Sequence, residues 1–538
     1  MKKTTKLLVL ALSLAMIISS FAGCGGKNPA IEGMEKSDLV LNGDKIYPIQ
    51  SDTVLDYWCI TGLAPDIENF GDTPLAAEIE RLTGVKINYM HAQGGSGSEQ
   101  FQIMLASDDL PDIVEHDWKT YPGGPAQAIA DEYIYDLTDI LPEWAPALTK
   151  ILKDNPDWDR QSKTTDGKYF AYPFIRGDVK LCVGAGNYIR KDWLDKAGLP
   201  VPETIDEWYE TLKTFKENGA TRVLTGAQTK NPFIWAYGIA DGFYLDGDTV
   251  KYGPYESGYK EFLTTFAKWY KEGLVDPDIA INDTKTVEAA IMNGEAGVVY
   301  GWAGGGLGKY LSAAKNSDSV DPDFNMVAVN TPTLKKGEIP EFGQLSNDVV
   351  LSYSAAISKN CKDVELAARF LDFGYTEQGN VTLNFGIEGE SFNWVEKDGK
   401  QYPQYTDLIL NNPEGKTISD MLRTYTRASV AGVMVQRVEY VEQYYQMPQQ
   451  KDALTIFANT NMKEHLMPSI TIPTEKSEEY ADKMSQIKTY VDEMYVKFLT
   501  GREPIEKYDE YLAQLEKFGV KDVIAIQQDA YDAYKKIK

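Results

Sequence analysis

The sequence predicts an α/β fold of two lobes. The chain of 538 residues is too long for one ordinary hydrophobic core, and its 43% hydrophobic and 12% aromatic content is typical of a globular protein. Strand-like and helix-like segments alternate over residues 54–115 and again over residues 187–302. Such alternation builds a sheet flanked by helices, so we expect each stretch to form one lobe, with a cleft between the two.

The first lobe is predicted from alternating strands and helices that end in polar loops. These are strand Val54–Trp58, helix Pro74–Leu82 ended by Gly84, strand Val85–Tyr89, helix Glu99–Ala106 and strand Pro111–Glu115. Parallel strands joined by helices bind ligands at their carboxyl ends. The loops at those ends hold Trp58, His91, Gln93, Asp117 and Trp118.

The second lobe follows a predicted hairpin, in which an Asp-Gly turn lies between aromatic residues over 166–174. Thr204 and Glu207 have the spacing of a capping box, which predicts a helix that runs to Lys216. The other predicted elements are strand Asn187–Arg190, helix Lys191–Ala197, helix Tyr259–Lys271 and strand Ala296–Trp302. Farther along, apolar residues at helical spacing over Tyr480–Phe498 predict a long amphipathic helix that packs on a core.

Residues 1–24 resemble a bacterial lipoprotein signal. Three lysines precede the apolar run Leu7–Ile18, which is too short to span a membrane as a mature helix, and Phe21–Cys24 follows at once. The resemblance implies that Cys24 is lipidated and becomes the mature N-terminus, although Phe21 replaces the usual leucine. The alternatives are an uncleaved anchor helix and a plain secretory signal. Residues 25–51 have the composition of a flexible tether, so we expect a protein anchored to the cell membrane and facing outward.

Charge and motif content argue against several classes of function. A formal net charge of −26 repels phosphate backbones, so we expect no nucleic-acid partner. The cysteines Cys59, Cys182 and Cys361 have no metal-binding spacing, and the chain holds three histidines. The glycine-rich segment 301–309 departs from a phosphate-binding loop at two positions. We therefore predict no metal site, no cofactor and no catalytic residue.

Several sequence blocks resemble the extracellular solute-binding proteins of ABC importers, in the cluster that includes maltose-type binding proteins. The first blocks are Phe101–Val114, Asn187–Trp208 and Ile291–Trp302. The later blocks are similar to the LipO-like lipoproteins, a subgroup that includes alginate-oligosaccharide binders: Phe385–Gly389, Tyr490–Met494, Phe498–Gly501 and Gln527–Tyr534. The resemblance extends over nearly all of residues 54–534.

The resemblance implies a periplasmic-binding-protein-like fold, with a ligand cleft and a hinge between the lobes. The N-terminal lobe would be residues 52–172 with about 330–372, the C-terminal lobe 173–329, and residues 373–538 a helical region that packs on both lobes and lines the cleft. The chain would cross between the lobes near Tyr172–Phe174 and near Val329–Pro332. Such crossings form a hinge.

The same resemblance implies a monomeric substrate-binding protein that captures an oligosaccharide and delivers it to a membrane permease. Two alternatives stay open at this point. Carboxylates beside aromatic residues also make glycan-degrading enzymes, and the same fold can bind a peptide or another polar solute.

The expected ligand contacts are aromatic side chains beside polar groups. Trp302 is the first candidate because it aligns with a tryptophan of maltose-type binders. The others are Trp58, Glu388, Tyr172, Arg176, Asp117, Trp118, Gln93, Trp235 and Phe392. Each has a competing structural role, such as core packing for the aromatic residues or a surface ion pair for Arg176. Some alginate-binding relatives carry a calcium loop after the helix that ends here at Lys216, but Glu217–Arg222 lacks the alternating carboxylates that such a loop needs.

Overall fold

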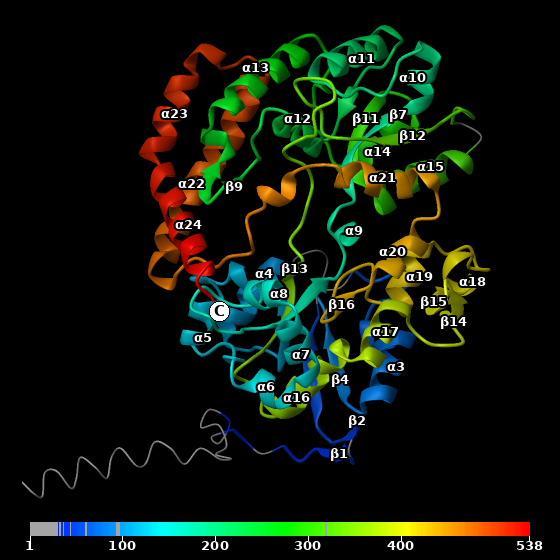
Figure 1. Ribbon diagram of the computed structural model, residues 1–538, viewed down its shortest axis with the longest axis vertical. Helices are drawn as coiled ribbons and strands as arrows, with labels where there is room; N and C mark the ends of the chain where they lie inside the picture. Colours follow the sequence, from blue (N-terminus) through cyan, green and yellow to red (C-terminus); the bar gives the residue numbers. More distant parts are fainter. Residues whose placement is uncertain are drawn as a thin grey trace, which may run out of the picture.

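The computed structural model describes residues 31, 34–35, 37–43, 45–59, 62–92, 97–317 and 320–537. Two lobes lie one above the other in Figure 1, each built around its own sheet. The sequence prediction of a two-lobed α/β fold is therefore confirmed.

The N-terminal lobe contains a six-stranded sheet in the order β16-β6-β13-β5-β3-β4. The strand β3 pairs in parallel with β4 and β5, as the alternating sequence predicted. In contrast, β13 enters from much later in the chain and pairs antiparallel with both β5 and β6. The strands are β3 (Val54–Trp58), β4 (Lys86–Met90), β5 (Ile113–His116), β6 (Tyr172–Arg176), β13 (Val349–Ile357) and β16 (Val435–Gln436).

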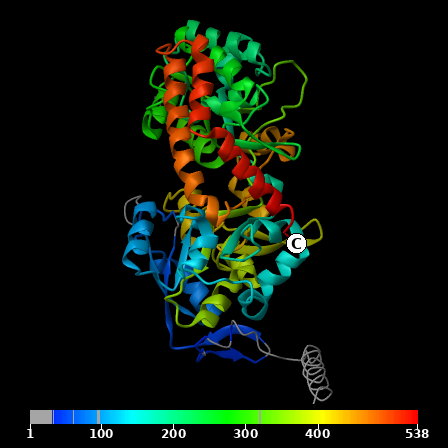
Figure 2. The same ribbon diagram turned by 90° about the vertical axis from the view of Figure 1, so that its left-hand side faces the viewer.

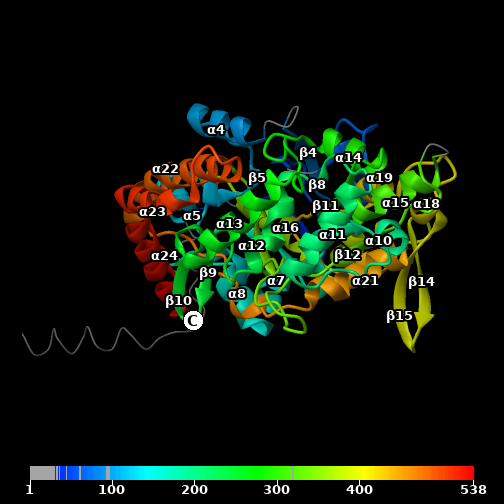
Figure 3. The ribbon, with the colours of Figure 1, turned by 90° about the horizontal axis from the view of Figure 1, so that it is seen from above.

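The C-terminal lobe contains a four-stranded sheet in the order β12-β7-β11-β8. The strand β11 is antiparallel to β7 and parallel to β8. The strands are β7 (Ala185–Arg190), β8 (Val223–Thr225), β11 (Ala296–Trp302) and β12 (Met326–Val329). Three hairpins of the described residues stand apart from the two sheets: β1 (Val40–Asn42) with β2 (Lys45–Gln50), β9 (Phe243–Asp246) with β10 (Thr249–Tyr252), and β14 (Phe392–Lys397) with β15 (Lys400–Tyr405). Figure 3 shows that the hairpin of β14 and β15 projects from the body of the protein.

Helices cover both sheets. Those of the N-terminal lobe are α3 (Pro74–Thr83), α4 (Gly97–Ser107), α5 (Gly124–Ala130), α6 (Ile140–Trp144), α7 (Pro146–Asp154), α8 (Pro156–Gln161), α16 (Val364–Asp372), α17 (Glu377–Phe385), α18 (Asp407–Leu410), α19 (Ile418–Tyr425) and α20 (Val438–Tyr444). Those of the C-terminal lobe are α10 (Lys191–Ala197), α11 (Ile205–Glu217), α12 (Asn231–Trp235), α13 (Ser257–Lys271), α14 (Thr284–Met292), α15 (Lys309–Lys315) and α21 (Pro448–Ala458).

The helix ends show why the local sequence folds this way. The hydroxyl of Thr73 caps α3 by accepting from the backbone N–H of Ala76, and Gly84 ends the helix in a left-handed conformation at φ 74°. A side chain at Gly84 would clash, because its Cβ would lie 2.0 Å from the carbonyl oxygen of Ile49. The predicted cap of α11 also forms, but the carboxylate of Glu207 accepts from the N–H of Glu203 (2.8 Å), one residue before the expected partner.

The chain passes between the lobes more than once. The first crossing follows β6, so it comes after Arg176 and contains the short helix α9 (Val179–Cys182), slightly beyond the expected Tyr172–Phe174. The second crossing joins β12 to β13 over residues 330–348, and the third joins α20 to α21 over residues 445–447. These segments lie together at the waist of the molecule in Figure 1.

The last three helices, α22 (Thr474–Leu499), α23 (Tyr508–Lys517) and α24 (Val520–Tyr534), form a flank along one side. In Figure 2, α22 rises from the N-terminal lobe to the C-terminal lobe, and α24 runs back down. The core of the C-terminal lobe includes apolar residues of α22 such as Ile487, Val491 and Phe498. Within the described residues, no helix is both long enough and apolar enough to cross a bilayer.

Candidate functional site

Trp302 is the last residue of β11 and presents its indole ring to solvent. It pairs with Ala185 of β7, and 49% of its surface is exposed. The glycine-rich stretch after it forms a π-helical turn, η5 (Ala303–Gly308). The indole lies close to the backbone of Gly184, since a Cβ there would be in van der Waals contact with the Trp302 ring (3.6 Å) and with Leu454 (3.7 Å). A broad aromatic face therefore lies open beside the first crossing.

A set of polar contacts joins the first two crossings next to Trp302. The side-chain oxygen of Gln344 accepts from the backbone N–H groups of Gly184 (2.9 Å) and Ala185 (3.2 Å). The amide nitrogen of Gln344 and the hydroxyl of Ser346 both donate to the carbonyl of Cys182 (3.2 Å each). The two crossings are thus held together by side chains that a sugar or another polar ligand could also engage.

Arg176 lies at the end of β6 and reaches into this region. Its Nη1 donates to the hydroxyl of Ser346 (2.5 Å), while its Nε is buried without an acceptor among the described residues. Burial lowers the pKa of the Arg176 guanidinium, and its electrostatic neighbours are one thiol and three phenols, those of Cys182, Tyr353, Tyr440 and Tyr445. We call the group Arg176, Gln344, Ser346, Tyr353, Tyr445 and Trp302 the hinge site.

Asp117 lies at the border of the hinge site. The strand β5 ends at His116, which pairs with Ser354 of β13, and the next residues along these antiparallel strands are Asp117 and Tyr353. Tyr353 is 37% exposed, and Asp117 caps a short turn by accepting from the N–H of Lys119 (3.2 Å). Both side chains can therefore reach a ligand that lies against the carboxyl end of β5.

Four of the predicted ligand residues lie in cores. Trp58 and Phe392 are each 2% exposed, and Tyr172 and Trp118 are fully buried. The indole N–H of Trp118 donates to the carbonyl of Val114 (3.2 Å), and Tyr172 packs beside Tyr375 with ring centroids 6.4 Å apart. Because these rings fill the interior, they are left out of the hinge site.

The remaining predicted residues lie elsewhere. Glu388 is on an exposed turn before β14, and Trp235 lines a separate pocket of about 600 Å³ with residues of the 332–341 segment. Gln93 and Cys24 lie outside the described residues.

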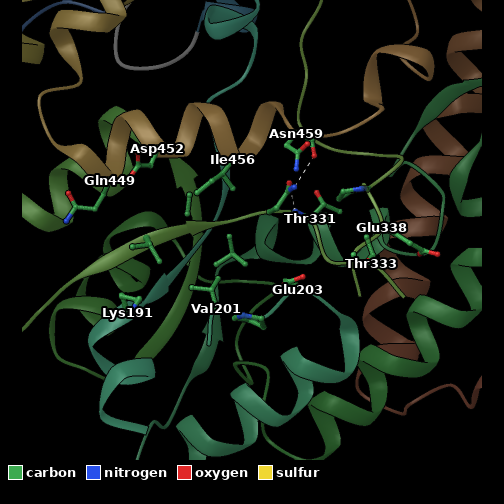
Figure 4. Close-up of a pocket in the computed structure, with 17 residues that line it drawn as sticks. Lys191, Val201, Glu203, Thr331, Thr333, Glu338, Gln449, Asp452, Ile456 and Asn459 are labelled. Carbon is green, nitrogen blue, oxygen red and sulfur yellow. Dashed lines mark hydrogen bonds between the residues drawn. The ribbon is translucent and has the colours of Figure 1, made fainter. Parts of the chain in front are cut away.

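Two further pockets flank α21 near the hinge site. One, of about 490 Å³, lies between α21 and β12 and is drawn in Figure 4, where the side-chain amide of Asn330 donates to the carbonyl of Asn459 (3.0 Å). The other, of about 1270 Å³, lies among α9, α20, α21 and β15 and shares Asn330, Ile456 and Asn459 with the first. Tyr445 lines the larger pocket and also neighbours Arg176, so the pocket and the hinge site share this residue.

Sequence reasoning missed Gln344, Ser346, Tyr353 and Tyr445. Tyr353 lies on β13, where Val349 and Leu351 are buried. Period-two alternation would place Tyr353 on the same buried face, and the irregular register between Val350 and Ala355 exposes it instead. The other three lie in crossing segments without periodicity. Their proximity to Arg176 depends on pairings between segments far apart in the chain.

The segment after α11 holds an arginine instead of a row of carboxylates. Arg222 donates to the fully buried carboxylate of Asp276 (3.0 Å) and lies 3.4 Å from Asp278 and 3.5 Å from Glu295. Within the described residues, no cluster of three histidine, cysteine, aspartate or glutamate side chains is arranged to hold a metal ion.

Two lobes joined by repeated crossings, with an exposed aromatic ring and hydrogen-bonding groups at the crossings, define a binding protein of the periplasmic-binding-protein-like fold. The chain belongs to the bacterial extracellular solute-binding protein family, whose profile matches residues 71–381. The resemblance found in the sequence is thereby confirmed, and membership identifies a binding protein, not an enzyme.

Curated relatives match over nearly the whole chain. The fructooligosaccharide ABC transporter substrate-binding protein FusA of Streptococcus pneumoniae is 24% identical over 98% of this chain and 98% of its own length. Lipoprotein LipO of Bacillus subtilis is 24% identical over 86% of this chain and 89% of its own.

Solved structures show the same fold. The alginate-binding protein AlgQ2, in a crystal structure without calcium ion, matches with a TM-score of 0.72 and 23% identity, covering 90% of this chain and 99% of its own. FusA of S. pneumoniae in complex with kestose matches with a TM-score of 0.71 and 21% identity, covering 90% and 100%. At these identities the likeness establishes the fold and leaves the ligand to be argued from the site.

Proposed function

We propose that this chain is the substrate-capturing component of a carbohydrate ABC importer and binds an oligosaccharide at the hinge site. Trp302 carries the proposal, because it offers a half-exposed indole face from one lobe beside donors that belong to the crossings. A binding protein needs its ligand to contact both lobes, since only a ligand with different affinity for the open and closed forms drives closure.

The chemistry of the site suits a sugar. A pyranose ring has an apolar C–H face that stacks on an aromatic ring and a rim of hydroxyls that need hydrogen-bonding partners. Trp302 supplies the ring, while Arg176, Ser346 and Tyr353 supply donors and acceptors within one region. Relatives named for fructooligosaccharide and for melibiose, raffinose and stachyose support this ligand class.

The predicted export signal supports a place for the protein at the cell surface. Lipidation of Cys24 would hold the two lobes near the permease outside the cell membrane. The tether is shorter than the expected 25–51, because β1 and β2 form a hairpin within residues 40–50 and Ile49 is buried. LipO, which is named as a lipoprotein, supports the anchor. Labelling of the expressed protein with a palmitate analogue, lost on Cys24→Ala, tests it; labelling that persists in the variant would contradict it.

Binding to defined oligosaccharides tests the function. Thermal shift across neutral and acidic oligosaccharides and short peptides should show a raised Tm with at least one saccharide, because a ligand bound to the native state stabilises it. The dissociation constant, measured by calorimetry, should be on the order of micromolar. If peptides raise the Tm and no saccharide does, the proposed ligand class is wrong.

Replacing Trp302 tests the site. Trp302→Ala should raise the Kd about thirtyfold, since losing an aromatic anchor costs about 2 kcal/mol in a binding site. Trp158→Ala is the matched control, because Trp158 is a half-buried tryptophan on α8 that is not part of the hinge site, and it should leave the Kd unchanged. Equal effects of the two variants would remove Trp302 from the site.

A further inference from the structure

Arg176 is a largely buried cation without a counter-charge. No carboxylate of the described residues lies within 4.0 Å of its guanidinium, although the chain has 80 acidic residues against 54 lysines and arginines. The nearby carboxylate of Asp348 is directed at Sγ of Cys182 (3.6 Å) instead. The hydroxyl of Ser346 and the surrounding phenols are neutral, so they solvate the cation without balancing its charge.

The two most enclosed arginines of the described residues are both paired with carboxylates. Arg190 is 2% exposed and donates to both oxygens of Asp192 (2.8 and 2.6 Å), and Arg427 is 5% exposed and donates to Glu115 (2.7 Å). An isolated buried charge costs free energy that a paired charge recovers in part. The protein therefore keeps Arg176 unpaired at a cost in stability, which is expected where a ligand supplies the missing charge.

The guanidinium of Arg176 has donors that are free within the described residues and that an anionic ligand group could engage. Ser346 fixes Nη1, while Nη2 has no acceptor among the described residues and, unlike Nε, is not enclosed. A guanidinium presents its donors in a planar fork that matches the two oxygens of a carboxylate. Burial lowers the pKa of Arg176, so the surroundings disfavour the cation until an anion arrives.

We propose that the ligand of the hinge site carries a carboxylate that pairs with Arg176, so that the captured saccharide is an acidic one of the uronate type. This inference rests on the proposed function, because it names the class of saccharide for the same site. The net charge of the chain does not oppose it, since local pairing at a desolvated cation outweighs a screened long-range field.

Matched ligands test the proposal. The probes are hexuronate oligosaccharides of several linkages and the same oligosaccharides with each carboxyl reduced to an alcohol, measured by calorimetry at constant ionic strength. A hydrogen-bonded charge pair between the ligand and Arg176 strengthens binding. For the oligosaccharide that binds, the Kd of the acidic form should therefore be about ten to a hundred times lower than the Kd of its reduced form. If a reduced form or another neutral saccharide binds as tightly, the proposal is overturned while the proposed function stands. If no saccharide binds, both are overturned.

Variants of Arg176 add a readout that does not depend on the identity of the saccharide. Arg176→Met keeps an unbranched apolar stem and removes the unpaired charge, so the ligand-free variant should melt at a higher temperature than the wild type and lose its preference for acidic saccharides. Arg437→Met is the control, because Arg437 is paired with Glu439 (2.6 Å), and this variant should show no rise in Tm. A lower Tm of the ligand-free Arg176→Met protein would show that the cation is structural and would overturn the proposal.

Discussion

Glu115 and Arg427 form the most enclosed ion pair of the N-terminal lobe. Their side chains are 0% and 6% exposed, and Arg427 Nη2 donates to Glu115 at 2.7 Å. The hydroxyl of Tyr57 also donates to Glu115 (2.6 Å), so both carboxylate oxygens are satisfied. The pair joins β5, just before the border of the hinge site, to the segment after α19.

Removing one partner of this pair should be costly, because the other charge stays buried. We expect Arg427→Met to lower the free energy of unfolding by about 3–5 kcal/mol. The double variant Arg427→Met with Glu115→Gln should recover much of that loss. Urea denaturation of the two variants measures the difference, and equal losses would mean that an unpaired Glu115 is not the cause.

Single residues were predictable from sequence only where a local rule applies. The sequence placed Trp302 at the end of a strand and Thr204 at a helix cap, and the structure has both there. Trp58 ends β3 and Trp118 comes shortly after β5, yet their rings turn into the core, since the side of the sheet that a residue faces depends on how the strands pair. Arg176 was predictable as a candidate, but its missing counter-charge was not.

At the scale of elements, local alternation predicted the parallel strands and not the antiparallel insertions. The order β3, α3, β4, α4 and β5 agrees with the prediction because each step is a short crossover. The insertion of β13 between β5 and β6 joins segments more than 170 residues apart in sequence, and period-two patterning carries no information on partners. This insertion brings Tyr353 and Ser346 to Arg176 and so creates the hinge site.

The contribution of the contact between α16 and α7 to the stability of the protein should depend on pH. Asp372 at the end of α16 is fully buried and accepts from the backbone N–H groups of Ala147 (3.1 Å) and Leu148 (2.8 Å) at the start of α7. Burial raises the pKa of Asp372 from 3.8 to about 6. The folded state therefore binds this proton more tightly than the unfolded state does.

This difference in proton affinity sets the direction in which stability changes with pH. As pH rises from about 4 to about 6, the unfolded state loses the proton first, so the contribution of Asp372 to the free energy of unfolding falls, by up to about 3 kcal/mol. Asp372→Asn removes this term, so its stability relative to wild type should increase from pH 4 to pH 7. Urea denaturation at each pH measures the difference. Asp154→Asn, an exposed carboxylate on α7, is the control, and a flat difference for Asp372→Asn would contradict the prediction.

At the scale of the whole molecule, the C-terminal helices connect the two lobes outside the hinge. The hydroxyl of Ser477 in α22 donates to the carbonyl of Gly123 in the N-terminal lobe (3.2 Å). At the far end of the chain, the guanidinium of Arg160 on α8 lies over the ring of Tyr534 in α24, 5.6 Å from its centroid. Both helices also pack on the C-terminal lobe, so opening and closing of the lobes must strain or slide these contacts.

We therefore expect the contact between Arg160 and Tyr534 to limit how far the lobes separate. Tyr534→Ala should increase the radius of gyration of the ligand-free protein in small-angle X-ray scattering. It should also weaken ligand binding, because a larger share of the population then starts from an open form that does not bind. Tyr531→Ala is the matched control: Tyr531 is 9% exposed against 7% for Tyr534, belongs to the same apolar cluster and neighbours Asp248 of the C-terminal lobe. If both variants change the radius and the Kd equally, local destabilisation of α24 is the cause, and the bridge between the lobes has no part in closure.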